Sequence, residues 1–278
     1  MSLNRKLIGR PLEPLTFSYD EDRVILYALG VGAGVDELEY VYEKGLKVLP
    51  GFAVVPVMPN IFQLIQAAGI NLKGALHTGH KITLYGPIPL SGTVTTTGTM
   101  LEVYDQGDKG ALIQASFETR DEDGGLLFKN FYAVLDRTAG NFGGAPIPKS
   151  EMMLPPQGVA PDFSMAHTSS ADQCAIYRLS GDKNPLHIDP EFARQARLDK
   201  PILMGLCTFG FAIRAIVNSV CHGEPFCLKS FSCRFTGIVY PGDQLITEGW
   251  RHENGRYMIQ TKTGDGKIVL ANALAEID

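Results

Sequence analysis

The chain has 278 residues, of which 45% are hydrophobic and 20% are charged, and its formal net charge is −5 at pH 7. This composition is typical of a soluble globular protein with one large domain or two modest ones. The negative charge argues against a nucleic acid partner, and the five cysteines form no C-x-x-C pair that would indicate a metal site or a disulfide framework. We expect neither a signal peptide nor a membrane span.

The first half, residues 1–137, is expected to hold two helices followed by strands. The helices are expected at 22–29 and about 60–68, and the strands at 81–85, 93–103, 111–120 and 126–135. Gly30, Gly32 and Gly34 come directly after the first helix, whereas the glycine loop of a dinucleotide site follows a strand. We therefore reject a dinucleotide site.

The second half, residues 162–278, repeats this order after a Gly- and Pro-rich stretch, residues 138–161, that is a linker or a binding loop. A shift of 150 residues places Tyr27 on Tyr177 and Gly92 on Gly242, which indicates a diverged internal duplication. Helices are expected at 171–179, 190–195 and 205–220, and strands at 231–235, 244–252, 257–263 and 268–277.

The helix at 205–220 is apolar on most sides, so the strands that follow should wrap it. A buried helix inside a curved antiparallel sheet is the hot-dog fold. The chain is therefore predicted to have an α+β double hot-dog fold, in which two antiparallel sheets each wrap a central helix.

One short stretch carries the candidate chemistry. Asp182, Asn184 and His187 lie within six residues, and Pro185 restricts the backbone between them, so the segment should be a rigid loop. An acid and a base on one stiff loop can act together on a single bound atom. The alternative is structural: Asp182 caps a helix and His187 packs in a core.

This stretch, Tyr177 to Pro190, resembles the signature of the (R)-specific enoyl-CoA hydratases, the MaoC-like or hydratase 2 family, and the likeness continues to Gly210. Tyr27–Ala33, Tyr42-Glu43 and Phe142-Gly143-Gly144 also resemble the hydratase 2 part of the eukaryotic peroxisomal multifunctional enzymes. The resemblance implies reversible hydration of trans-2-enoyl-CoA to (3R)-3-hydroxyacyl-CoA in fatty acyl-CoA metabolism. It also implies a homodimer and no cofactor, with coenzyme A present only as part of the substrate.

The shift of 150 residues pairs Asp182 with Gly32 and His187 with Glu37, so the first half lacks both groups and one site per chain is expected. The resemblance implies that the first half instead houses the acyl tail. Asp182 and His187 would hold the water, with their acid and base roles unassigned. The N–H of Gly205, at the start of the apolar helix, is the candidate donor to the enolate oxygen.

Further residues have two possible roles each. Asn184 touches the water or fixes the loop, and Glu43 matches a carboxylate that matters in relatives or is a surface residue. Phe142, Gly143 and Gly144 lie near coenzyme A or form a plain crossover between the halves. His77 and His80 stand where relatives have a His-Gly-Glu-Gln run, which puts a coenzyme A contact there in doubt.

Two rival functions remain open. The nearest rival is a different enzyme on the same scaffold, either a hot-dog thioesterase or the dehydratase of a fatty-acid or polyketide pathway. A thioesterase would be expected to carry a carboxylate on the central helix, and residues 205–220 contain no Asp or Glu. A non-catalytic acyl-CoA binding protein would not need Asp182 and His187 together. The chain ends without an S-K-L type address, so peroxisomal and cytoplasmic locations both stay open.

Overall fold

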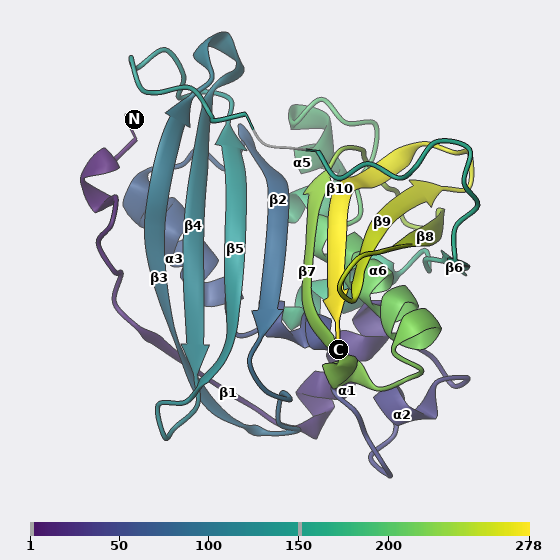
Figure 1. Ribbon diagram of the computed structural model, residues 1–278. Helices are drawn as coiled ribbons and strands as arrows, with labels where there is room; N and C mark the ends of the chain where they lie inside the picture. Colours follow the sequence, from purple (N-terminus) through teal and green to yellow (C-terminus); the bar gives the residue numbers. More distant parts are fainter. Residues whose placement is uncertain (1–2, 150–151) are drawn as a thin grey trace.

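A computed structural model describes residues 3–149 and 152–278 of the chain. Its strands form one ten-stranded antiparallel sheet in the order β1-β3-β4-β5-β2-β7-β10-β9-β8-β6 (Figure 1). The strands of the first half are β1 (Leu15–Tyr19), β2 (Ala75–Leu84), β3 (Gly92–Asp105), β4 (Ala111–Arg120) and β5 (Leu126–Asp136). Those of the second half are β6 (Phe163–Thr168), β7 (Leu228–Phe235), β8 (Gln244–His252), β9 (Arg256–Thr263) and β10 (Ile268–Ile277).

The sheet differs from the prediction in one respect, because the two predicted sheets are joined into one. Strand β2 pairs with β7 from Gly79 opposite Arg234 to Thr83 opposite Ser230. Each half-sheet would otherwise end in a strand with unpaired N–H and C=O groups, and the two edges satisfy each other. Each half still has its own helix behind its strands, so the predicted double hot-dog fold is confirmed.

The helices lie behind the sheet in the view of Figure 1. They are α1 (Glu21–Gly30), α2 (Leu38–Val41), α3 (Met58–Ala68), α4 (Gln173–Tyr177), α5 (Pro190–Gln195) and α6 (Gly205–Val220). Helix α6 is the central helix of the second half, and its side chains from Leu206 to Val217 are all buried. A buried Leu, Ile or Phe contributes about 1.5–3 kcal/mol relative to an exposed one, so this helix anchors the core.

The central helix of the first half is shorter. Helix α3 spans 11 residues and follows a 3₁₀ helix, η2 (Pro50–Val54). Together, Pro50–Ala68 reach the length and mean hydropathy of a membrane-spanning helix, although the sequence was not expected to contain a segment of that kind. The most apolar window of this segment is 72% buried inside the protein, as expected for a core helix.

The stretch between the halves, residues 138–149 and 152–161, contains neither helix nor strand and runs past the ends of β10 and β9 (Figure 1). Side chains of both half-sheets hold it, among them Asp105 and Asn272. The Asp105 carboxylate at the end of β3 accepts hydrogen bonds from the N–H groups of Asn141, Gly143 and Gly144. The Asn272 side chain of β10 accepts one from the Met153 N–H at 2.6 Å.

Candidate active site

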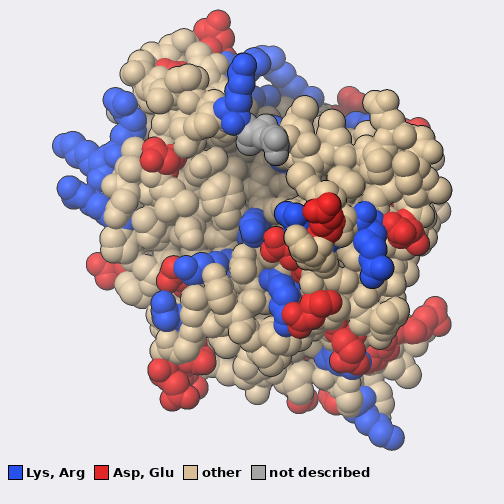
Figure 2. All heavy atoms as spheres, in the orientation of Figure 1, with Lys and Arg blue, Asp and Glu red and all other residues tan. Residues whose placement is uncertain are grey.

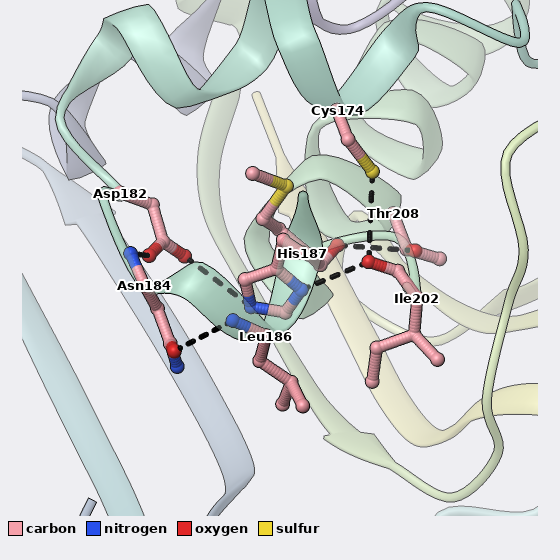
Figure 3. A network of polar contacts seen from close by, with 8 residues as sticks. Cys174, Asp182, Asn184, Leu186, His187, Ile202 and Thr208 are labelled. Atoms are coloured by element: carbon pink, nitrogen blue, oxygen red, sulfur yellow. Dashed lines mark hydrogen bonds and ion pairs between the residues drawn. The ribbon is translucent and has the colours of Figure 1, made fainter. Parts of the chain in front are cut away.

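The loop between α4 and α5 brings the Asp182 carboxylate and the His187 ring face to face (Figure 3). The Asn184 N–H donates to Asp182 Oδ1 at 3.2 Å, and Asn184 Oδ1 accepts from the Leu186 N–H at 3.1 Å. The second bond caps the short 3₁₀ helix Pro185–His187, with Pro185 at its first position. These bonds make the loop rigid, and both of the Asn184 contacts stabilise the loop conformation.

The tautomer of His187 follows from its neighbours. Its Nδ1 lies 2.9 Å from the carbonyl oxygen of Ile202. A carbonyl oxygen can only accept, so Nδ1 carries the proton and Nε2 of the neutral ring has a free lone pair. Nε2 lies 3.9 Å from Asp182 Oδ2. This distance is too long for a direct hydrogen bond and suits a water molecule bonded to both atoms.

Both side chains line a cavity of about 460 Å³ between the two halves, a volume within the range of small-ligand sites. Asn184 and Gly205 line it as well, together with apolar side chains of α3. The α3 residues are Met58, Ile61, Phe62 and Ile65. His187 is therefore not sealed in a core, although it is only 8% exposed.

Gly205 is the first residue of α6, and the preceding Met204 provides no side-chain cap. The N–H groups in the first turn of a helix lack partners within the helix, and the helix dipole favours negative charge there. A Cβ on Gly205 would lie 3.2 Å from the ring of Phe235, closer than ordinary packing allows. A glycine at this position therefore leaves room for an oxygen atom to approach the amide.

Comparisons with known proteins agree with this architecture. Residues 154–273 match the model of the MaoC like domain, and residues 17–138 match the MFE-2 hydratase 2 N-terminal domain. The chain is 33% identical to the "Probable enoyl-CoA hydratase 2" of Dictyostelium discoideum, over 99% of this chain and 96% of that protein. It is 36% identical to the "Enoyl-CoA hydratase 2, peroxisomal" of Arabidopsis thaliana, over 95% of this chain and 92% of that protein.

The chain belongs to the MaoC-like enoyl-CoA hydratase 2 family. Among solved structures, the peroxisomal multifunctional enzyme type 2 of Drosophila melanogaster superposes with a TM-score of 0.84 at 33% identity. That match covers 97% of this chain and 49% of the fly protein, so the chain spans about half of it. A MaoC-like dehydratase from Phytophthora capsici has a TM-score of 0.86 at 26% identity, with 98% of each chain covered.

Two predicted parts of the hydratase site lie away from the cavity. Glu43 is exposed and does not line it. Phe142, Gly143 and Gly144 do not line it either, and the amides of the two glycines already donate to Asp105. The predicted coenzyme A contact of this segment therefore has no free backbone donor at Gly143 or Gly144.

The carboxylate of the first half that does reach α6 is Glu37. It forms an ion pair with Arg214, whose side chain is 2% exposed, and accepts a hydrogen bond from Asn218 at 2.5 Å. Glu37 is the residue that the shift of 150 pairs with His187. A Cβ at Gly32, the partner of Asp182 in that alignment, would collide with the ring of Phe211. The second candidate site of the duplication is thus filled by side chains.

Three aromatic residues at the cavity wall were not assigned to the site from the sequence. The rings of His77 and Tyr132 pack at a tilt with centroids 4.5 Å apart, and those of His77 and Phe235 lie 4.6 Å apart. Burial, and then the neighbouring His80, lower the pKa of His77 well below its ordinary value, so its ring is neutral. A β-bulge between His77 and Gly79 turns the His77 side chain toward the inside, where His80 also lies.

Proposed function

We propose that this protein adds water to trans-2-enoyl-CoA thioesters to give (3R)-3-hydroxyacyl-CoA, and catalyses the reverse dehydration, in fatty acyl-CoA metabolism. One observation carries the proposal. The free Nε2 of His187 and Oδ2 of Asp182 face each other at 3.9 Å in a cavity that also contains Gly205 at the start of α6. The names of the relatives, enoyl-CoA hydratase 2, support the same reaction.

In the proposed reaction each group has one task. A water molecule between Asp182 and His187 donates one hydrogen to each, and His187 Nε2 accepts a proton as the water oxygen forms its bond to C3. The C2–C3 π electrons form a double bond between C1 and C2 while the carbonyl π electrons move to the thioester oxygen, where the Gly205 N–H stabilises the negative charge of the enolate. The Asp182–His187 pair then returns the accepted proton to C2 on the same face, so OH and H have both been added and the pair is restored.

Two neighbours support this cycle. The Ile202 carbonyl accepts the Nδ1–H bond of His187 and stabilises the imidazolium that forms during the reaction, as does the Asp182 carboxylate. The apolar wall of α3 accommodates the acyl tail in the first half. No metal or redox cofactor is needed for this reaction, and coenzyme A enters only with the substrate.

We also propose that the protein is a homodimer and that its location is peroxisomal or cytoplasmic. The outer surface over β3, β4 and β5 is largely uncharged (Figure 2), and Leu112, Phe131 and Leu135 are half-buried on these strands. An uncharged sheet face of this kind favours contact with a second copy. Several relatives are named as peroxisomal enzymes, which supports the first location. Sedimentation of the purified protein would test the dimer.

The function is tested by hydration of crotonyl-CoA and trans-2-decenoyl-CoA with chiral analysis of the product. Asp182→Asn and His187→Gln should each lower kcat by about 100-fold or more, since each removes one of the two groups that hold and deprotonate the water. Asp172→Asn is the matched control, because this carboxylate is exposed and makes no cap hydrogen bond. A product of (3S) configuration, or full activity without Asp182, would contradict the proposal.

The same assay separates the rival functions. A thioesterase would release free coenzyme A thiol, which a thiol reagent detects, whereas a hydratase leaves the thioester intact. An acyl-CoA binding protein would bind the substrate without converting it, and Asp182→Asn would leave its affinity unchanged. The absence of any Asp or Glu from α6 favours the hydratase over the thioesterase.

A further inference from the structure

Tyr132 is a polar residue that the first half contributes to the wall of the reaction cavity. It lies on β5, with inward-facing neighbours Asn130 and Val134, and its side chain is 6% exposed. It lines the same cavity as Asp182 and His187. Its ring packs at a tilt against His77, with centroids 4.5 Å apart, and in an edge-on arrangement against Phe117, with centroids 6.4 Å apart. The ring is thus held in one orientation from two sides.

The neighbouring polar groups on β2 already have partners, whereas the Tyr132 hydroxyl does not. Thr78 Oγ1 donates to the carbonyl of Ala133 at 3.1 Å, and His77 Nε2 donates to the carbonyl of Gly79 at 3.1 Å. The Tyr132 hydroxyl makes no hydrogen bond with any residue in 3–149 or 152–278. Buried tyrosine hydroxyls normally have a partner, so this donor is available to a molecule in the cavity.

The charge state of Tyr132 suits a donor. Burial, and then the nearby Asp182 carboxylate, raise the pKa of its phenol well above the ordinary value. The hydroxyl therefore keeps its proton throughout the range in which the protein would work.

A water molecule between Asp182 and His187 uses both hydrogens as donors, which leaves its two lone pairs. One lone pair attacks C3, and the other can accept a hydrogen bond. We propose that the Tyr132 hydroxyl donates this bond to the reacting oxygen, which is the water in hydration and the 3-hydroxyl in dehydration. The bond fixes the attacking lone pair on C3, and in the reverse direction it stabilises the negative charge on the leaving oxygen. This inference rests on the proposed hydratase function.

The test compares Tyr132→Phe, which removes only the hydroxyl, with Tyr257→Phe. Tyr257 on β9 is the matched control, because it is also 6% exposed but does not line the cavity. We expect Tyr132→Phe to lower kcat for crotonyl-CoA hydration by about 10- to 100-fold while KM changes by less than about twofold. The value of kcat/KM should fall by the same factor in both directions, because the equilibrium constant of the reaction is unchanged.

Binding of saturated butyryl-CoA, which has no oxygen at C3, should be equal in the wild type and Tyr132→Phe, and so should the thermal midpoint. An unchanged kcat in Tyr132→Phe would overturn the inference and leave the hydratase function standing. A rise in KM alone, or the same loss in Tyr257→Phe, would also overturn it. A wild-type protein that does not hydrate crotonyl-CoA or decenoyl-CoA would instead refute the proposed function itself.

Discussion

The ion pair of Glu37 and Arg214 should be a main support of the contact between the two halves. Arg214 lies on α6 with its side chain 2% exposed, and Glu37 comes from the loop before α2 with its side chain 18% exposed. Arg214 Nε and Nη2 have no hydrogen-bond partner within 3–149 and 152–278, so Glu37 and the nearby ring of Phe211 are the groups that compensate its charge. Glu37→Gln leaves a buried cation without its counter-charge.

Breaking a buried ion pair on one side costs about 3–5 kcal/mol, and the partial exposure of Glu37 favours the lower figure. For a chain of this size, about 3 kcal/mol corresponds to a fall of roughly 6–12 °C in the thermal midpoint. Glu43→Gln is the matched control, because Glu43 is exposed six residues further along the same segment, and its effect should stay within about 0.5 kcal/mol.

Circular dichroism during heating measures both variants. The double variant Glu37→Gln, Arg214→Met should recover much of the loss, because it removes the stranded charge together with its partner. The kcat of Glu37→Gln in the folded state should stay close to that of the wild type, since Glu37 does not line the cavity. Equal midpoints for Glu37→Gln and Glu43→Gln would refute this reasoning.

Three further predictions follow from single contacts. Gly205→Ala should lower kcat/KM by about 10- to 100-fold with little loss of stability, because its methyl group meets the Phe235 ring and blocks the approach of the thioester oxygen; steady-state kinetics and thermal unfolding check this. Burial lowers the pKa of His80 to about 4, against 6.5 for an ordinary histidine, so the unfolded chain binds a proton there that the folded protein does not. The free energy of unfolding therefore falls by about 3 kcal/mol as the pH drops from 6.5 to 4, and it is unaffected by His80 above pH 6.5. Urea unfolding at several pH values should show a weaker pH dependence in His80→Gln than in the wild type. Asp105→Asn should speed hydrogen exchange of the Gly143 and Gly144 amides and leave KM for enoyl-CoA unchanged, since this segment does not line the cavity; a raised KM would contradict this.

The regular parts of the fold were predictable because their patterns are local. The apolar spacing of α6 and the alternation of Phe231, Cys233 and Phe235 in β7 are visible within one window of sequence. The edge strands β1 and β6 were missed although every second residue turns away from solvent in each, because they span only five and six residues and so short an alternation is a weak signal. The joining of the two half-sheets through β2 and β7 depends on residues about 150 positions apart, which no local pattern encodes.

In the candidate site, too, the residues of one local segment were predictable and those brought together by the fold were not. Asp182, Asn184 and His187 belong to one loop, and the structure places all three at the cavity with Gly205. Glu43 was selected by its likeness to relatives, whereas the contact with α6 is made by Glu37, six residues earlier, because the backbone of this irregular segment decides which side chain turns inward. A single tyrosine on a strand carries no motif, so Tyr132 could be found only from the structure.

The two halves differ at the loops that the shift of 150 residues aligns. The loop of Asp182 and His187 in the second half lies near α3, a helix of 11 residues whose apolar side chains leave a cavity open beside both residues. The corresponding loop of the first half packs against α6, which spans 16 residues and fills that position with Phe211 and Arg214. A second active site would therefore need more than a new Asp and His in the first half. It would also require smaller side chains in place of Phe211 and Arg214 on α6, which now occupy that space.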